Sequence, residues 1–353
     1  MGRRRADGGH GVNQPQRHKD TEETKPRLGV FVSPWLLLFV VSVLFVSTQS
    51  ASTQSLSYTK GQNIAPAYEG WELGADGQKY FLFGYMNRNW EEELDVTIGA
   101  QNGFTPGTAD QGQPTHFLPR RNRFVFRVKV PATFTEKDEL IWTLTTHGKT
   151  EKAYASLRPD YVVDDVVKAS ETGALGAGTS SPEVRSNTAP TVHIEEVKAR
   201  SVKVTEAVTF VSEVKDDGIP KRRPPSAAQL QRLQAAAQNL DPALAASLRN
   251  PTMSPPSRIT VGKVTGLHVS WFVYRQPAGA KVVFDPPQVK AWEDTRANMN
   301  SPWAPQWTPT PIPADGKQPV NASFSMPGTY VLRCRADDGA LVGDDEITIV
   351  VTR

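Results

Sequence analysis

Residues 327–339, PGTYVLRCRADDG, followed by residues 346–352, EITIVVT, decide the fold of this chain. In both runs apolar residues recur at every second position, which is typical of β-strands that bury one face. The turn sequence Asp337-Asp338-Gly339 ends the first run. The chain is therefore expected to end in two β-strands that belong to stacked antiparallel sheets.

Three earlier runs extend this pattern toward the N-terminus. They are Val208–Val214, Leu267–Arg275 with Trp271 pointing inward, and Pro319–Phe324. In this order, with PGTYVLRCRADDG and the β-branched final strand, the runs resemble bacterial Ig-like and PKD-type domains. The resemblance covers roughly residues 190–352 and implies a β-sandwich domain over 191–353, but no activity.

The chain departs from the antibody pattern at its only cysteine, Cys334. Antibody domains place a tyrosine two residues before the second cysteine, whereas Tyr330 and Cys334 are four positions apart. No partner cysteine exists, so no intrachain disulfide can form. We therefore expect Cys334 to be a small buried apolar residue.

A first β-sandwich domain is predicted over residues 58–165. Its strand signals are runs of alternating residues bounded by turns, at 69–73, 79–86, 94–98, 123–130, 140–146 and 151–157. The expected fold class is all-β, with two β-sandwich domains, the second of them Ig-like.

Two segments break this strand pattern. Residues 168–190 are rich in Gly, Ser, Thr and Ala and predict a flexible linker. Ser226 and Gln229 form a capping box, followed by leucines at helical spacing. A small helical insertion is therefore predicted within the second domain, at about 219–257.

The N-terminal part predicts export. Residues 1–27 are polar and are expected to form a disordered cytoplasmic leader. Residues 28–47 form an apolar, uncharged segment that can cross a membrane as a helix, and basic residues precede it. Both a cleaved signal peptide and an uncleaved membrane anchor fit this segment. In either case the body lies outside the cytoplasm, in the periplasm or on the extracellular face of the envelope.

Charge and motifs exclude several functions. The net charge of +3 arises before Leu28, so the exported body is neutral and binding of nucleic acid is not expected. The histidines show no zinc spacing, and no nucleophile elbow, Walker loop or dinucleotide motif occurs. The whole chain also resembles exported proteins of environmental bacteria. We expect a non-enzymatic binding or structural protein of the envelope, with a protein or glycan partner outside the cytoplasm.

Carboxylates predict one candidate metal site. In an Ig-like sandwich the loops after the strands at 208–214 and 330–336 lie at the same end, which would gather Asp216, Asp217, Asp337 and Asp338. Such oxygen ligands suit Ca²⁺. The alternative is that these residues serve turn geometry and are neutralised by Lys221 and the arginines after it. This loop end, with the insertion, is the expected contact surface for a partner.

Two other groups of residues are candidate binding sites. Trp292, Trp303 and Trp307 lie among Pro and Asn residues and could form a platform for sugars, so a carbohydrate-binding accessory protein is the alternative function. Burial of these side chains is the competing interpretation. In the first domain, His116 and the arginines at 120, 121 and 123 follow the acidic residues 91–93. Surface ion pairs explain this group, and an anion site is the alternative.

Overall fold

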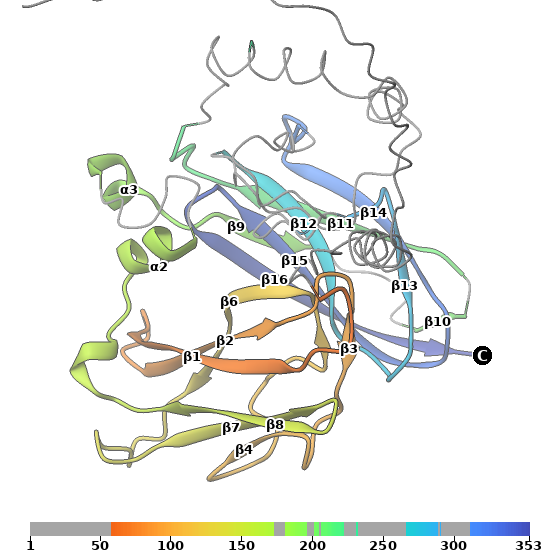
Figure 1. Cartoon of the computed structure of the whole chain (residues 1–353). Coiled ribbons are helices and arrows are strands. Elements are labelled where there is room, and N and C mark those ends of the chain that lie inside the picture. Colours follow the sequence, from red (N-terminus) through yellow and green to blue (C-terminus); the bar gives the residue numbers. More distant parts are fainter. Residues whose placement is uncertain are drawn as a thin grey trace, which may run out of the picture. The chain divides into compact units, whose positions relative to one another are not determined.

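The chain forms β-sheets in a computed structural model, which describes residues 58–172, 181–195, 201–204, 206–221, 231, 266–288, 290 and 311–353 (Figure 1). Strands dominate these ranges, and the described helices are short. The sheets are stacked over two apolar cores. The prediction of an all-β fold built from sandwiches is therefore confirmed.

The first sandwich stacks the sheet β1-β2-β6 on the sheet β4-β7-β8, with the short pair β3-β5 beside them. Its strands are β1 (Ile64–Leu73), β2 (Lys79–Asn87), β3 (Leu94–Asp95), β4 (Asn102–Thr105), β5 (His116–Phe117), β6 (Arg120–Lys129), β7 (Leu140–Thr146) and β8 (Lys149–Ala155). Aromatic rings fill the space between the sheets. The Phe104 ring lies 5.1 Å from Phe83 and 5.8 Å from Trp142, measured between centroids. These contacts stabilise the core beyond the burial of apolar area.

The second sandwich stacks the sheet β10-β16-β15-β12 on the sheet β13-β14-β11-β9. Its strands are β9 (Thr191–Ile194), β10 (Ser201–Lys203), β11 (Val208–Lys215), β12 (His268–Arg275), β13 (Val282–Asp285), β14 (Lys317–Phe324), β15 (Gly328–Asp337) and β16 (Val342–Thr352). Trp271 is buried as predicted, and its ring lies 5.5 Å from Phe210. Cys334 is fully buried in the same core, and burial raises the pKa of its thiol.

The two sandwiches are joined by buried contacts of β12. Tyr274 belongs to β12, yet its ring packs in the apolar core of the first sandwich. Its hydroxyl donates a hydrogen bond of 2.5 Å to the carbonyl oxygen of Gly112. The next residue, Arg275, forms two hydrogen bonds, of 2.7 and 3.0 Å, to the Asp110 carboxylate. The outward face of β12 is therefore covered by the first sandwich.

The strand pairing in the sheet β1-β2-β6 is irregular near Gly84 of β2. The pairing of β1 with β2 shifts at Glu69, between the pairs Tyr68–Phe83 and Gly70–Leu82. On the other side of β2, the three residues 123–125 of β6 lie opposite Gly84. A Cβ atom at Gly84 would lie only 2.2 Å from Glu69 Oε1 and 2.4 Å from the Asn122 carbonyl oxygen. The irregularity therefore requires glycine at this position, and β-bulges of this kind often lie beside functional sites.

Short helices occupy the segment that was predicted to be a linker. The 3-10 helix η1 (Pro159–Tyr161) and the helices α2 (Asp165–Thr172) and α3 (Pro182–Ser186) follow the first sandwich. Ala169 of α2 and Val184 of α3 are buried against Ala340 and Leu341. The described ends of the segment 168–190 thus cover the turn between β15 and β16. A flexible linker over 168–190 as a whole stays a prediction.

Several predictions fall outside the described residues. They concern the leader 1–27, the apolar segment 28–47, the helical insertion at about 219–257 beyond its first residues, and the three tryptophans Trp292, Trp303 and Trp307. Within the described ranges, no helix is long and apolar enough to span a bilayer.

Candidate functional site

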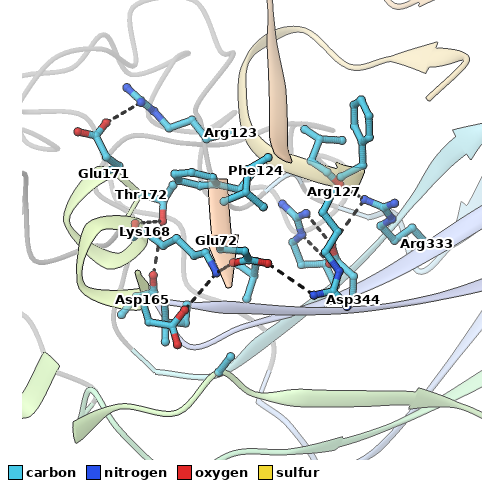
Figure 2. Close-up of a pocket in the computed structure, with 18 of the residues that line it drawn as sticks. Glu72, Arg123, Phe124, Arg127, Asp165, Lys168, Glu171, Thr172, Arg333 and Asp344 are labelled. Carbon is cyan, nitrogen blue, oxygen red and sulfur yellow. Dashed lines mark hydrogen bonds and ion pairs between the residues drawn. The ribbon is translucent and has the colours of Figure 1, made fainter. Parts of the chain in front are cut away.

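A cavity of about 800 Å³ lies between the two sandwiches and α2 (Figure 2). Its walls are the outward face of β1, β2 and β6, the turn and strands β15–β16 of the second sandwich, and one side of α2. Ligand pockets in proteins measure roughly 300–1,000 Å³. The cavity is therefore large enough for a small molecule.

Strand β6 supplies three arginines to the first wall: Arg121, Arg123 and Arg127. Successive side chains of a strand point to opposite faces, so residues at odd positions share one face. The bulge preserves this parity, because three residues of β6 lie opposite one residue of β2. All three arginines therefore remain on the outward face, while Asn122 and Phe126 point into the sandwich.

The second wall is formed by charged pairs across β15 and β16. Arg335 lies directly opposite Asp344 and donates to its carboxylate from two nitrogens, at 2.7 and 2.8 Å. Arg333 bonds Glu346 and the Val125 carbonyl oxygen of β6. Burial alone would raise the pKa of Asp344, but the charges of the two arginines hold it below its usual value. The side chains of this wall are therefore charged, and their ion pairs hold them in place.

The third wall, α2, is attached through ion pairs in addition to the buried contact of Ala169. Lys168 Nζ lies 2.5 Å from Glu72 Oε2 of β1, and Glu171 Oε2 lies 2.5 Å from Arg123 Nη1 of β6. The Arg123 and Glu171 side chains are 35% and 44% exposed. Ion pairs between exposed groups contribute little to stability, about 0–1 kcal/mol. The Arg123 guanidinium can therefore exchange Glu171 for another anion at small cost.

The lining carries more basic than acidic side chains. Its bases are Arg121, Arg123, Arg127, Lys168, Arg333 and Arg335, and its acids are Glu72, Asp165, Glu171 and Asp344. Glu69 and Glu346, the acidic partners of Arg121 and Arg333, lie outside the lining, so the cavity surface itself presents more basic than acidic groups. The rest of the lining includes the apolar residues Leu82, Phe124 and Leu341.

One arginine has an unused donor. Arg121 Nη2 lies 2.7 and 2.8 Å from the two oxygens of Glu69, whose side chain is almost fully buried. Burial raises the pKa of Glu69, although Arg121 and Arg123 act against this shift. Arg121 Nη1 is buried and has no hydrogen-bond partner among the described residues. Such a donor is costly unless a further acceptor binds it.

The structure separates the residues of the predicted anion site, His116 and the arginines at 120, 121 and 123. Arg121 and Arg123 line the cavity. His116 is instead enclosed between Glu93, at 3.2 Å, and Asp95, at 2.8 Å. The Arg120 guanidinium stacks on the Trp90 ring, 4.2 Å from its centroid. His116 is therefore a buried residue paired with acids, Arg120 packs on a tryptophan, and the other two arginines belong to the cavity.

Two of the predicted metal ligands, Asp337 and Asp338, are buried, and Asp338 is held by protein donors. Asp338 Oδ1 accepts from the backbone N–H groups of Ala340 and Leu341, at 2.6 and 2.8 Å. Its Oδ2 accepts from Asn187 Nδ2 at 3.0 Å. Asp337 Oδ1 accepts from the backbone of Gly339. These carboxylates therefore shape the turn between β15 and β16, beneath the segment that follows α3.

The other two, Asp216 and Asp217, lie at the same end of the sandwich. Asp217 Oδ2 accepts from the backbone and hydroxyl of Thr188, at 2.9 and 2.6 Å, and Asp216 accepts from Gly218. No cluster of three or more His, Cys, Asp or Glu side chains suited to a metal ion is found in the described part of the chain. Calcium binding stays a prediction. The Asp338 side chain is fully buried within the loop end that is expected to contact a partner. That contact stays a prediction.

Asp338 predicts a pH dependence of stability. Burial raises its pKa to about 6, despite the hydrogen bonds that it accepts. Between about pH 4 and pH 6 the folded state retains a proton that the unfolded state releases, so this group lowers the free energy of unfolding as pH rises. Asp338→Asn removes the effect. Between pH 4 and pH 7 the free energy of unfolding of the variant, relative to that of the wild type, should rise by up to about 3 kcal/mol, since one pKa unit corresponds to about 1.4 kcal/mol.

Urea unfolding at several pH values measures this difference. The new amide can be satisfied, because Asn187 Oδ1 has no hydrogen-bond partner among the described residues and a flip of that amide would present it. The expectation is wrong if the stability difference between variant and wild type does not change with pH.

Sequence reasoning missed Arg127, Lys168, Arg333 and Arg335. The available signal was charge complementarity in the final hairpin, where Arg333 and Arg335 alternate with apolar residues and face Asp344 and Glu346. An exposed hairpin would show the same pattern. That the first sandwich covers this face could not be inferred from the hairpin alone.

Comparison with known proteins identifies no family. No family model matches the chain, and no curated protein does. Several solved structures are similar to it only remotely. One is a conjugative transposon lipoprotein from Bacteroides eggerthii, with 9% identity, a TM-score of 0.21, and coverage of 45% of this chain and 95% of that chain.

Two further similar structures come from surface proteins. Domains 4 and 5 of the S-layer protein SbsC give 7% identity and a TM-score of 0.22, covering 61% of this chain and 66% of that one. The D00-D0 domain of intimin gives 10% identity and a TM-score of 0.19, covering 82% and 100%. TM-scores of this size are too low to transfer any function to this chain.

Proposed function

We propose that this chain is an exported, non-enzymatic binding protein that holds an anionic ligand in the cavity between its sandwiches. The partly exposed guanidinium groups of Arg123 and Arg127 carry this proposal, since both line the cavity and a ligand anion can reach them. The excess of basic side chains in the lining acts in the same direction. Arginine suits this task because its planar fork binds carboxylates and phosphates through two parallel hydrogen bonds.

Export is part of the proposal and rests on the sequence. The apolar segment 28–47 follows a basic leader, which favours translocation of the body. The Arg333 and Tyr274 side chains fix the second sandwich against the first, so the walls of the cavity are held in place. This arrangement supports a binding role. A pre-formed site loses less free energy on binding than a site that must be ordered.

Calorimetry with the full chain in mild detergent tests the proposal. The probes are acetate, citrate, inorganic phosphate and trigalacturonate. The double variant Arg123→Gln/Arg127→Gln should lower the affinity for the tightest-binding probe at least tenfold, because a hydrogen bond to a charged group is worth about 1.5–3 kcal/mol. Both side chains are partly exposed, so the variant is expected to fold.

Arg88→Gln is the matched control. Arg88 is 42% exposed, is ion-paired with Glu151 and does not line the cavity. It should leave every affinity within about twofold of the wild type, because Arg88 does not line the cavity. The proposal is overturned if no probe binds, or if the double variant weakens binding no more than the control does.

A further inference from the structure

The acids of the cavity restrict the kind of anion that fits. Glu72, Asp165, Glu171 and Asp344 stand among the arginines. A ligand with anionic groups alone would meet these four carboxylates as like charges, which disfavour each other. A ligand that also carries hydroxyl groups can donate hydrogen bonds to them. The lining therefore suits a molecule with both acidic and hydroxyl groups.

Phe124 adds an aromatic surface to the same cavity. It is half-buried and lines the cavity among the charged side chains, as Figure 2 shows. Its backbone φ is 48°, in the left-handed region that residues with a Cβ atom rarely adopt. Such backbone conformations cluster at functional sites, where the surrounding structure holds them. The face of an aromatic ring is electronegative, so it attracts the slightly positive C–H groups of a flat ligand.

We infer that the ligand is an acidic sugar, a short oligosaccharide that contains uronic acid residues. This inference rests on the proposed anion site and names the class of its ligand. Uronate carboxylates bind Arg123 and Arg127, and sugar hydroxyls donate to Glu72 and Asp165. The C–H face of a sugar ring lies on Phe124. A cavity of about 800 Å³ has room for a ligand larger than a single small acid.

Other anions match fewer of these features. Citrate and phosphate offer no C–H face to Phe124 and few or no hydroxyl groups to the four acids. A neutral oligosaccharide supplies hydroxyls and C–H faces but offers no carboxylate to Arg123 and Arg127. The combination of arginines, acids and a half-buried aromatic ring is met in full by a uronate sugar.

Calorimetry on the full chain compares three probes: trigalacturonate, its neutral counterpart galactotriose, and citrate. Trigalacturonate should bind at least tenfold more tightly than either of the others. Phe124→Leu keeps an apolar side chain but removes the flat ring. It should lower the affinity for trigalacturonate at least fivefold and leave the affinity for citrate within twofold of the wild type. Phe124→Tyr keeps the ring and should bind trigalacturonate like the wild type.

Tyr154→Leu is the matched control for loss of an aromatic ring. Tyr154 is 51% exposed on β8 and does not line the cavity, so this change should leave all three affinities unaltered. Citrate binding as tight as trigalacturonate, and lost in Arg123→Gln/Arg127→Gln, would overturn the sugar inference and leave the anion site standing. If Arg123→Gln/Arg127→Gln weakened the binding of none of the probes, both the sugar inference and the anion site would be overturned. Galactotriose binding as tight as trigalacturonate would also overturn both, because charge would then play no part.

Discussion

Tyr274→Ala should destabilise the protein by about 3–5 kcal/mol, the range for truncation of a buried aromatic side chain. Tyr274 is 3% exposed and packs in the core of the sandwich to which its own strand does not belong. Its ring also lies 3.7 Å from the Arg333 guanidinium, and burial raises the pKa of its hydroxyl to about 12. Urea unfolding, followed by tryptophan fluorescence, measures the loss.

Tyr274→Phe separates the ring from the hydroxyl group. It should cost only about 1 kcal/mol, since it removes a single hydrogen bond, the one to Gly112. The structural account of this junction is contradicted if Tyr274→Ala costs no more than Tyr274→Phe.

Arg333→Ala should cost about 3 kcal/mol, because it removes a buried, charged side chain that bonds both sandwiches. The Arg333 side chain is 7% exposed and contacts Asp344, Glu346 and the Val125 carbonyl oxygen. Burial would lower the pKa of Arg333, but Tyr274 and the two acids raise it, so the side chain is charged in the folded state. Chemical unfolding at neutral pH gives the magnitude.

Arg88→Ala is the comparison for Arg333→Ala. It removes an exposed ion pair to Glu151, so the loss should stay below about 1 kcal/mol. Arg333→Lys should fall between the two, because lysine keeps the charge but not the planar fork that stacks on Tyr274. Equal losses for Arg333→Ala and Arg88→Ala would show that Arg333 does not join the sandwiches.

The strands could be predicted because their residues alternate. The run 140–146 coincides with β7, and every second residue of it is buried. The first half of β1 was missed, since Pro66 interrupts the run and shows no strand propensity. Proline cannot donate to a neighbouring strand. The position tolerates it because β1 lies at the edge of its sheet, paired only with β2.

The helices beside the cavity gave weaker signals. Asp164 accepts from the backbone N–H of Val167 at 2.8 Å, and Ser181 precedes Pro182 and accepts from Val184 at 3.3 Å. Both are recognisable N-caps. Neither helix carries a long apolar stripe, so the composition of 168–190 predicted a linker instead. What holds these helices is their contact with Ala340 and Leu341, which sequence spacing does not reveal.

The cavity could be predicted only in part. Arg121 and Arg123 were considered as an anion site, and both line it. The remaining groups come from strands far apart in the chain, and they meet only because the outward face of β15 is covered. Docking of one sandwich on another depends on shape over the whole surface, which an alternating pattern does not encode.

The three residues opposite Gly84 also constrain how this protein can change during evolution. An insertion or deletion of two residues within 123–125 would leave the arginines of β6 on the side of the cavity. A change of one residue would turn Arg121 toward the aromatic core and Asn122 toward solvent, since each step along a strand reverses the side chain. Length variation in this stretch is therefore restricted to even numbers of residues.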